Sequence, residues 1–121
     1  MLNRLSPAVQ RQIGYLLLFI VFVASALPPG PATSISIEGA DKLLHCVAYF
    51  VLSAWFAFVM PARKYLLLAT WLFLFGVLIE VMHYFLPYRF ASIGDLVANV
   101  AGIVLGLVTI SVISRTTNAA R

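Results

Sequence analysis

The chain has 121 residues, of which 63% are hydrophobic and only 10% are charged. Soluble domains average about 45–50% apolar and about 25% charged residues, so this composition excludes a water-soluble globular domain and predicts an integral membrane protein. The net charge of +4 does not indicate nucleic-acid binding, because the basic residues lie singly or in pairs between apolar runs. The single cysteine, Cys46, excludes a disulfide within the chain.

Four apolar segments approach the roughly 20 residues that a helix needs to cross a bilayer. They lie at about residues 9–27, 41–60, 64–86 and 94–113. The first follows Ser6 and Pro7, which are typical of an N-cap and a first helical position, and it ends at the Pro- and Gly-rich stretch 28–31. A secretory signal peptide ending at the small residues 24–26 is the alternative for this segment.

These segments predict an all-α fold, a four-helix transmembrane bundle that forms a single domain over residues 1–121, because lipid provides no water to hydrogen-bond an exposed backbone. The short turns 61–64 and 87–93 make consecutive helices antiparallel neighbours. Cytoplasmic loops carry an excess of Lys and Arg. We therefore expect both termini to be cytoplasmic, because one side of the arrangement holds Arg4, Arg11, Arg63, Lys64, Arg115 and Arg121.

The polar residues of the opposite, outward half come from three segments and are predicted to meet at similar depth. Positions separated by three or four residues share one helix face. By this spacing, His45 lies on the same helix face as Asp41 and Tyr49. In the same way, His83 shares a face with Glu80, and Asn99 shares a face with Asp95. The predicted ligand-binding set comprises Asp41, Lys42, His45, Tyr49, Glu80, His83, Arg89, Asp95 and Asn99.

Glu80 is the most informative of these residues. An acid within a spanning segment costs about 2.5–3.5 kcal/mol on insertion scales, so Glu80 is predicted to face the bundle interior. It acts either as a general base, metal ligand or cation site, or as the structural partner of Lys42, His45 or Arg89. Glu80 and His45 are the candidate catalytic residues. His45, His83, Glu80 and Asp95 together offer nitrogen and oxygen donors that suit zinc or another divalent ion. The chain has no HExxH motif and no pair of cysteines, so we instead predict hydrogen-bonded histidines, with no metal and no cofactor.

Three features in and before the fourth segment have structural interpretations, and one of them also has a functional one. The planar guanidinium of Arg89 suits a lipid phosphate or a carboxylate, and the alternative is an interfacial anchor paired with Asp95. Ser92 and Asp95 have the spacing of a helix capping box. Gly102 and Gly106 form a GxxxG motif that lets another helix approach closely, either within the chain or in a homo-oligomer.

The order and spacing of these residues resemble the VanZ-like family of small bacterial membrane proteins. The family pattern has the form DKxxHxxxY, then ExxQ, then a Pro and an Arg ahead of a DxxxNxxG helix start. The resemblance covers about residues 24–107, and His83 stands where the family typically has Gln. The matching residues are Asp41, Lys42, His45, Tyr49, Glu80, Pro87, Arg89, Asp95, Asn99 and Gly102.

The resemblance implies a multi-pass protein of the bacterial cytoplasmic membrane, in a family whose namesake is associated with teicoplanin resistance. We expect non-enzymatic action at the outer leaflet, with membrane lipids, a lipid-linked envelope precursor or a glycopeptide as partners. One alternative is a membrane-embedded enzyme acting on a lipid-linked phosphate or ester, in which Lys42 and Arg89 hold the anion. Another is an oligomeric ion or proton path that uses Glu80.

Overall fold

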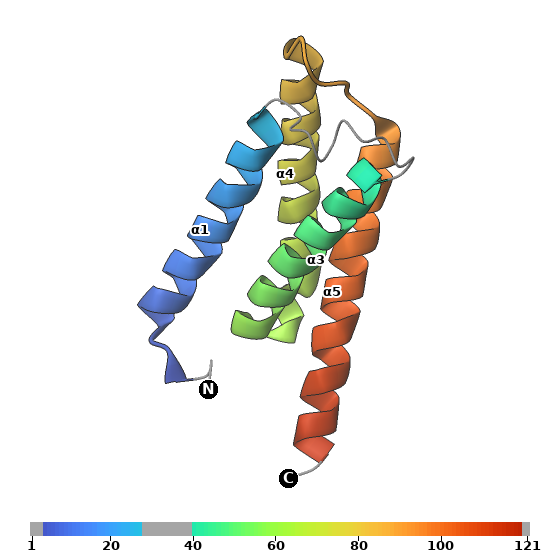
Figure 1. The fold of residues 1–121 in the computed structure, drawn as a ribbon. Coiled ribbons are helices and arrows are strands. Elements are labelled where there is room, and N and C mark those ends of the chain that lie inside the picture. Colours follow the sequence, from blue (N-terminus) through green and yellow to red (C-terminus); the bar gives the residue numbers. More distant parts are fainter. Residues whose placement is uncertain (1–3, 28–39, 120–121) are drawn as a thin grey trace.

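The computed structural model describes residues 4–27 and 40–119, and this part of the chain is helical without any strand. Figure 1 shows four long helices, each of which has the length and apolarity needed to cross a membrane. The predicted all-α class and the four predicted spans are therefore confirmed. The elements are α1 (Pro7–Ala26), α3 (Ala40–Val59), the short 3-10 helix η2 (Ala62–Lys64), α4 (Tyr65–Phe85) and α5 (Ile93–Ala119).

Most of the helix ends lie close to the positions predicted from local sequence signals. The Ser6 hydroxyl accepts a hydrogen bond from the backbone N–H of Val9 at 3.3 Å, which confirms the N-cap of α1. The Pro- and Gly-rich stretch that was predicted to end this helix lies outside the described residues. α5 continues to Ala119, so its predicted end at 113 is wrong. The helix continues because residues 107–119 contain neither Gly nor Pro, although their apolar pattern fades.

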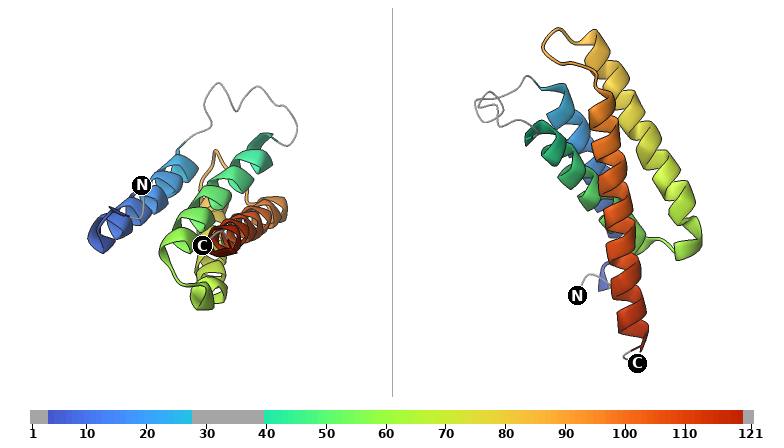
Figure 2. Two further views of the ribbon diagram at one scale, coloured as in Figure 1. Left: turned by 90° about the horizontal axis from the view of Figure 1, so that it is seen from below. Right: turned by 90° about the vertical axis from the view of Figure 1, so that its right-hand side faces the viewer.

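The helices form a bundle in which α1 occupies an outer position. Figure 2 shows α3 between α1 and α5, and α4 lies against both α3 and α5. The start of α1, the η2 turn and the end of α5 lie at one end of the bundle, and the α4–α5 connection lies at the other (Figure 1). The core between the helices contains Tyr49, Leu52, Ala57, Leu68, Leu72 and Ile103.

Two glycines bring α5 into close contact with α3. A Cβ atom at Gly102 would overlap the carbonyl oxygen of Cys46 and would lie 2.9 Å from the backbone nitrogen of Phe50. A Cβ atom at Gly106 would overlap the Ser53 hydroxyl and would lie 2.8 Å from the carbonyl oxygen of Phe50. Of the two arrangements that the sequence left open for the GxxxG motif, the structure therefore shows the one within the chain.

Candidate functional site

The end of the bundle that carries the α4–α5 connection contains a buried group of polar side chains from three helices. Tyr49 and Asn99 are each 1% exposed, Glu80 is 6% exposed and Asp95 is 3% exposed. Buried polar groups are costly unless they are hydrogen-bonded or paired, so their concentration in one place distinguishes this end from the apolar remainder. We call this group the polar centre, and it comprises Lys42, His45, Tyr49, Glu80, His83, Asp95 and Asn99.

His45 of α3 connects two residues of α5. Its Nε2 lies 3.6 Å from Oδ2 of Asp95, and its Nδ1 lies 3.2 Å from Oδ1 of Asn99. An amide oxygen accepts hydrogen bonds and does not donate them, so Nδ1 donates to Asn99 and Nε2 is directed toward the carboxylate. Lys42, one turn earlier on α3, places Nζ 3.7 Å from Oδ1 of Asp95 while its side chain stays 52% exposed. Asp95 thus lies between an exposed cation and a largely buried imidazole.

Glu80 is held by the end of its own helix and by the start of the next. Its Oε2 accepts a hydrogen bond from the backbone N–H of Ser92 at 2.9 Å, and its Oε1 lies 3.5 Å from Nδ1 of His83. The sequence left open a structural pairing of Glu80 with Lys42, His45 or Arg89, but the described side chain nearest to its carboxylate in an ion-pair contact is His83, one turn away on α4, which is charged only when its ring is protonated. The i, i+3 spacing of Glu80 and His83 is apparent from the sequence. The sequence does not show which of the basic side chains, Lys42, His45, His83 or Arg89, lies nearest to the Glu80 carboxylate.

The predicted capping box of α5 is half correct. The Ser92 hydroxyl accepts from the backbone N–H of Asp95 at 3.4 Å, as a capping serine should. The reciprocal bond is missing, because the Ser92 N–H donates to Glu80 and the Asp95 carboxylate faces Lys42 and His45. The end of α4 lies beside the start of α5, so Glu80 replaces Asp95 at the cap and Asp95 remains available to the polar centre.

Arg89 pairs with neither Asp95 nor Glu80, so the structure shows neither of the two ion pairs that the sequence left open for it as alternatives. Its Nη2 donates to the carbonyl oxygens of Ala24 at 3.3 Å and Leu27 at 2.8 Å, and its Nε donates to Leu27 at 3.2 Å. The last four carbonyls of a helix lack partners within that helix and carry partial negative charge. Arg89 therefore binds the C-terminal end of α1.

Two further side chains from the same region also bind the end of α1. The Tyr88 hydroxyl donates to the carbonyl oxygen of Ala26 at 2.5 Å. Nε2 of His83 lies 2.9 Å from the carbonyl oxygen of Ser25, and because a carbonyl only accepts, this nitrogen is the donor. His83 therefore links α1 to Glu80 and the polar centre.

Several buried polar atoms of the polar centre have no hydrogen-bond partner among the described residues. Leaving a buried polar group unpaired costs about 1–3 kcal/mol, and more if it is charged. Such atoms are usually rare and scattered in native proteins. Here they gather in one place, and they are the Tyr49 hydroxyl, Glu80 Oε1, His83 Nδ1, Asp95 Oδ1 and Asn99 Nδ2. This pattern is typical of a site that receives a further ligand.

Gly76 is a residue of this site that sequence reasoning missed. A Cβ atom at this position of α4 would lie 2.8 Å from Nδ2 of Asn99 and 3.2 Å from the Tyr49 hydroxyl. The missing side chain therefore makes room for both polar groups, and the available signal was a lone glycine inside an apolar span. Asp41 was also predicted to belong to the site, and its side chain lies outside the described part of the structure.

A cleft of about 350 Å³ lies between α1 and α3 beside the polar centre. Its walls are mainly apolar, and the polar side chains that line it belong to the residues already described. The lining residues are Ile20, Val21, Ala24, Ser25, Leu44, His45, Ala48, Tyr49, His83 and Arg89. The cleft thus joins an apolar groove on the side of the bundle to the buried polar centre.

Four apolar helices around a buried polar centre define a multi-pass membrane protein with one candidate site near one end of the bundle. A family model described as VanZ/LLP1 matches residues 3–114, nearly the whole chain. The chain therefore belongs to the VanZ-like family, as its sequence pattern indicated. No curated protein and no solved structure gave a significant match.

Proposed function

We propose that this VanZ-like protein is non-enzymatic and binds an amphiphile at the outer leaflet of the bacterial cytoplasmic membrane. By doing so it alters how envelope lipids or a glycopeptide antibiotic meet the membrane. The observation that carries the proposal is the cleft between α1 and α3, which is apolar along its walls and polar at one end. An amphiphile is divided in the same way, into an apolar chain and a polar headgroup.

The apolar part of the cleft suits a hydrocarbon chain. Ile20 on α1 and Leu44 on α3 line the cleft and are 52% and 57% exposed, respectively. In a membrane-spanning bundle such exposed apolar side chains contact lipid chains. A bound acyl chain would therefore remain continuous with the surrounding bilayer, and no described helix would have to move to admit it.

The polar part of the cleft favours an anionic headgroup. Arg89 uses Nε and Nη2 to bind α1, while Nη1 makes no hydrogen bond within the described residues. Its guanidinium is therefore positioned and still has donors for a phosphate. Lys42 supplies a second, half-exposed positive charge at the same end of the bundle. Together they favour a lipid phosphate or a carboxylate over a neutral headgroup.

The assignment to the outer leaflet rests on the distribution of basic residues. Arg63 and Lys64 lie in η2, at the opposite end of the bundle from the α4–α5 connection (Figure 1). Cytoplasmic ends of membrane proteins are enriched in Lys and Arg, which supports an outward-facing polar centre and cytoplasmic termini.

Cysteine labelling in a Cys46→Ser background tests this orientation, because Ala91 and Ala62 are exposed at opposite ends of the bundle. In intact spheroplasts, the Ala91→Cys variant should react with a membrane-impermeant maleimide. The Ala62→Cys variant should react only after lysis. The reverse pattern would place the cleft in the cytoplasmic leaflet and overturn the proposed leaflet.

Native mass spectrometry of the detergent-purified protein tests amphiphile binding. Hydrogen bonds to a charged group contribute about 1.5–3 kcal/mol, so phosphatidylglycerol should bind about tenfold more tightly than diacylglycerol, which has no phosphate. Ala48→Phe places a ring in the cleft and should remove this preference. The matched control is Ala101→Phe, at an exposed position of α5, which should bind like the parent. Equal binding of both lipids, or parental binding by Ala48→Phe, would contradict the proposal.

A membrane-embedded enzyme acting on a lipid-linked phosphate or ester is the second candidate. The contact between Glu80 and His83 favours it, because both side chains exchange protons and both are almost fully buried beside the cleft. Glu80→Gln separates the two functions. The glutamine oxygen can still accept from Ser92, so binding of phosphatidylglycerol should persist in either case. If the parent protein hydrolyses a lipid and Glu80→Gln binds the lipid without hydrolysing it, the enzyme is favoured over the non-enzymatic binding protein.

A further inference from the structure

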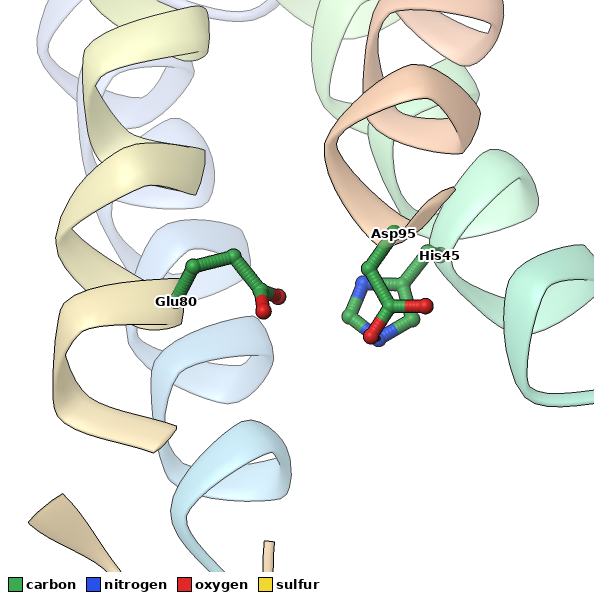
Figure 3. A group of neighbouring side chains, drawn as sticks. All are labelled: His45, Glu80 and Asp95. Carbon is green, nitrogen blue, oxygen red and sulfur yellow. Dashed lines mark ion pairs between the residues drawn. The ribbon is translucent and has the colours of Figure 1, made fainter. Parts of the chain in front are cut away.

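Three side chains of the polar centre have the geometry of a metal-binding site. His45, Glu80 and Asp95 each offer one ligand atom, and these three atoms all lie within 4.8 Å of one another. Figure 3 shows the Glu80 carboxylate directed from α4 toward the His45 ring and the Asp95 carboxylate on the other side. Each ligand comes from a different helix, so the packing of α3, α4 and α5 holds the three atoms together.

The surroundings of His45 orient its ring as in many metal sites. A metal-binding histidine generally donates its other ring N–H to a carboxylate, a carbonyl or water, which sets the ring orientation. Nδ1 of His45 donates to the amide oxygen of Asn99 at 3.2 Å, and Nε2 lies 3.6 Å from Oδ2 of Asp95. The ring thus directs Nε2 toward the Asp95 carboxylate.

The two carboxylates are buried, and each has an oxygen atom without a hydrogen-bond donor among the described residues, which also points to a ligand. Glu80 and Asp95 are 6% and 3% exposed, and Oε1 of Glu80 and Oδ1 of Asp95 have no hydrogen-bond donor among the described residues. A buried carboxylate is stable when it is paired or coordinates a metal. The remaining oxygen of Glu80 is held by the Ser92 N–H at 2.9 Å, which restrains the carboxylate.

The charges of the three side chains match a divalent cation. Two carboxylates and a neutral imidazole carry a charge of −2, which one divalent ion neutralises within the buried centre. Lys42 approaches Asp95 at 3.7 Å, but its side chain is 52% exposed. Its charge is therefore screened by solvent. His83 offsets the charge of Glu80 only when its ring is protonated, so with a neutral His83 most of the buried charge remains uncompensated.

We propose that His45, Glu80 and Asp95 bind one divalent transition-metal ion, with one nitrogen and two oxygen donors. Zinc accepts this donor set, with bonds of about 2.0–2.2 Å, so the ligand atoms need only a small inward adjustment. Three protein ligands leave a coordination position open. His45 also lines the cleft, so this position is accessible to water or to an anionic oxygen from the cleft.

The test uses full-length, tag-free protein purified in detergent, stripped with EDTA and titrated with Zn²⁺ and, separately, with Mg²⁺. Elemental analysis after dialysis should give about one zinc per chain, and Zn²⁺ should raise the thermal unfolding midpoint of the parent protein. Mg²⁺ should bind more weakly, because it prefers oxygen ligands and retains several waters. Absence of stoichiometric zinc in the parent would overturn the proposal.

Matched variants distinguish the proposed site from adventitious binding. Glu80→Gln and Asp95→Asn keep the side-chain shapes and should each lose the zinc-dependent rise in the unfolding midpoint. Asn99→Ala removes the partner of His45 and should weaken binding about 10–100-fold. Lys42→Gln removes a competing cation and His83→Gln removes the other histidine, so both should retain one zinc. If Glu80→Gln and Asp95→Asn bind like the parent, the assignment is wrong.

Zinc binding at this site does not require the amphiphile. Ala48→Phe fills the cleft without changing a proposed ligand, so it should lose lipid selectivity and keep its zinc. A protein that binds phosphatidylglycerol selectively but no zinc would overturn only the metal site. A protein that binds zinc without lipid selectivity would overturn only the proposed function.

Discussion

α5 and α1 are joined to the rest of the bundle by different interactions. α5 approaches α3 closely because Gly102 and Gly106 have no side chains at the points of contact. Ser53 then crosses the interface and donates to the carbonyl oxygen of Gly102 at 3.3 Å. This contact depends on small residues and on direct packing between two backbones.

α1 packs against the core through the partly buried Leu17, Leu18 and Val21, and it is also held by side chains that reach it from elsewhere. Of its residues, only Gly14 is buried. Tyr88, Arg89 and His83 bind the carbonyls at its C-terminal end, and Nε1 of Trp55 donates to the carbonyl oxygen of Gln10 at 3.2 Å. In lipid there is no hydrophobic force between helices, so helices associate through close packing and hydrogen bonds. The two contacts in this bundle show that either interaction can predominate.

The largest effect is expected from a large side chain at the α3–α5 contact. Gly102→Leu should lower the stability by about 3 kcal/mol, because the added atoms meet the backbone of α3 and the helices must separate. Thermal unfolding in detergent measures this loss. Ala101→Leu is the matched control at the neighbouring exposed position and should change the stability by less than about 0.5 kcal/mol. Equal unfolding midpoints for the two variants would refute the tight contact.

A smaller and more local effect is expected at the end of α1. Arg89→Gln should lose about 1–2 kcal/mol, because it removes charged donors from the last carbonyls of this helix at a half-exposed position. Hydrogen exchange should rise in residues 20–27 and stay unchanged in 102–110. Arg63→Gln, exposed at the other end of the bundle, is the control. Uniform exchange changes across both helices would show that α1 is not attached independently.

The smallest effect is expected from a single hydroxyl at the same end. Tyr88→Phe removes the bond to the carbonyl of Ala26 and should cost about 1 kcal/mol. Tyr84→Phe is the matched control, since Tyr84 is 76% exposed and its hydroxyl makes no hydrogen bond among the described residues. If both variants unfold like the parent, the Tyr88 bond does not contribute to holding α1.

The sequence was most informative about features that a single segment determines. The four spans and the N-cap at Ser6 depend on continuous apolarity and on neighbouring residues, and both agree with the structure. The end of α5 was predicted too early because the prediction followed the fading apolar pattern, and a helix can continue past the end of an apolar run. A helix stops only where its backbone is interrupted or capped.

In the candidate site, too, features set within one helix could be predicted, and features set by neighbouring helices could not. The depth of Glu80, His45 and Asn99 follows from a fixed rise per residue along each helix, so their convergence could be predicted. Gly76 was missed because the side chains for which it makes room belong to α3 and α5. The sequence contains the glycine but not the position of its neighbours.

The sequence by itself determined that this chain forms four helices long and apolar enough to cross a membrane, and that its polar residues meet near one end. Only the tertiary structure decided which of them are partners. It joined Glu80 to Ser92 and His83, turned Arg89 toward α1, and left Asp95 facing His45. The physical reason is that pairing depends on the rotation of each helix about its axis and on the offset between helices, which packing sets and which periodicity within one helix does not specify.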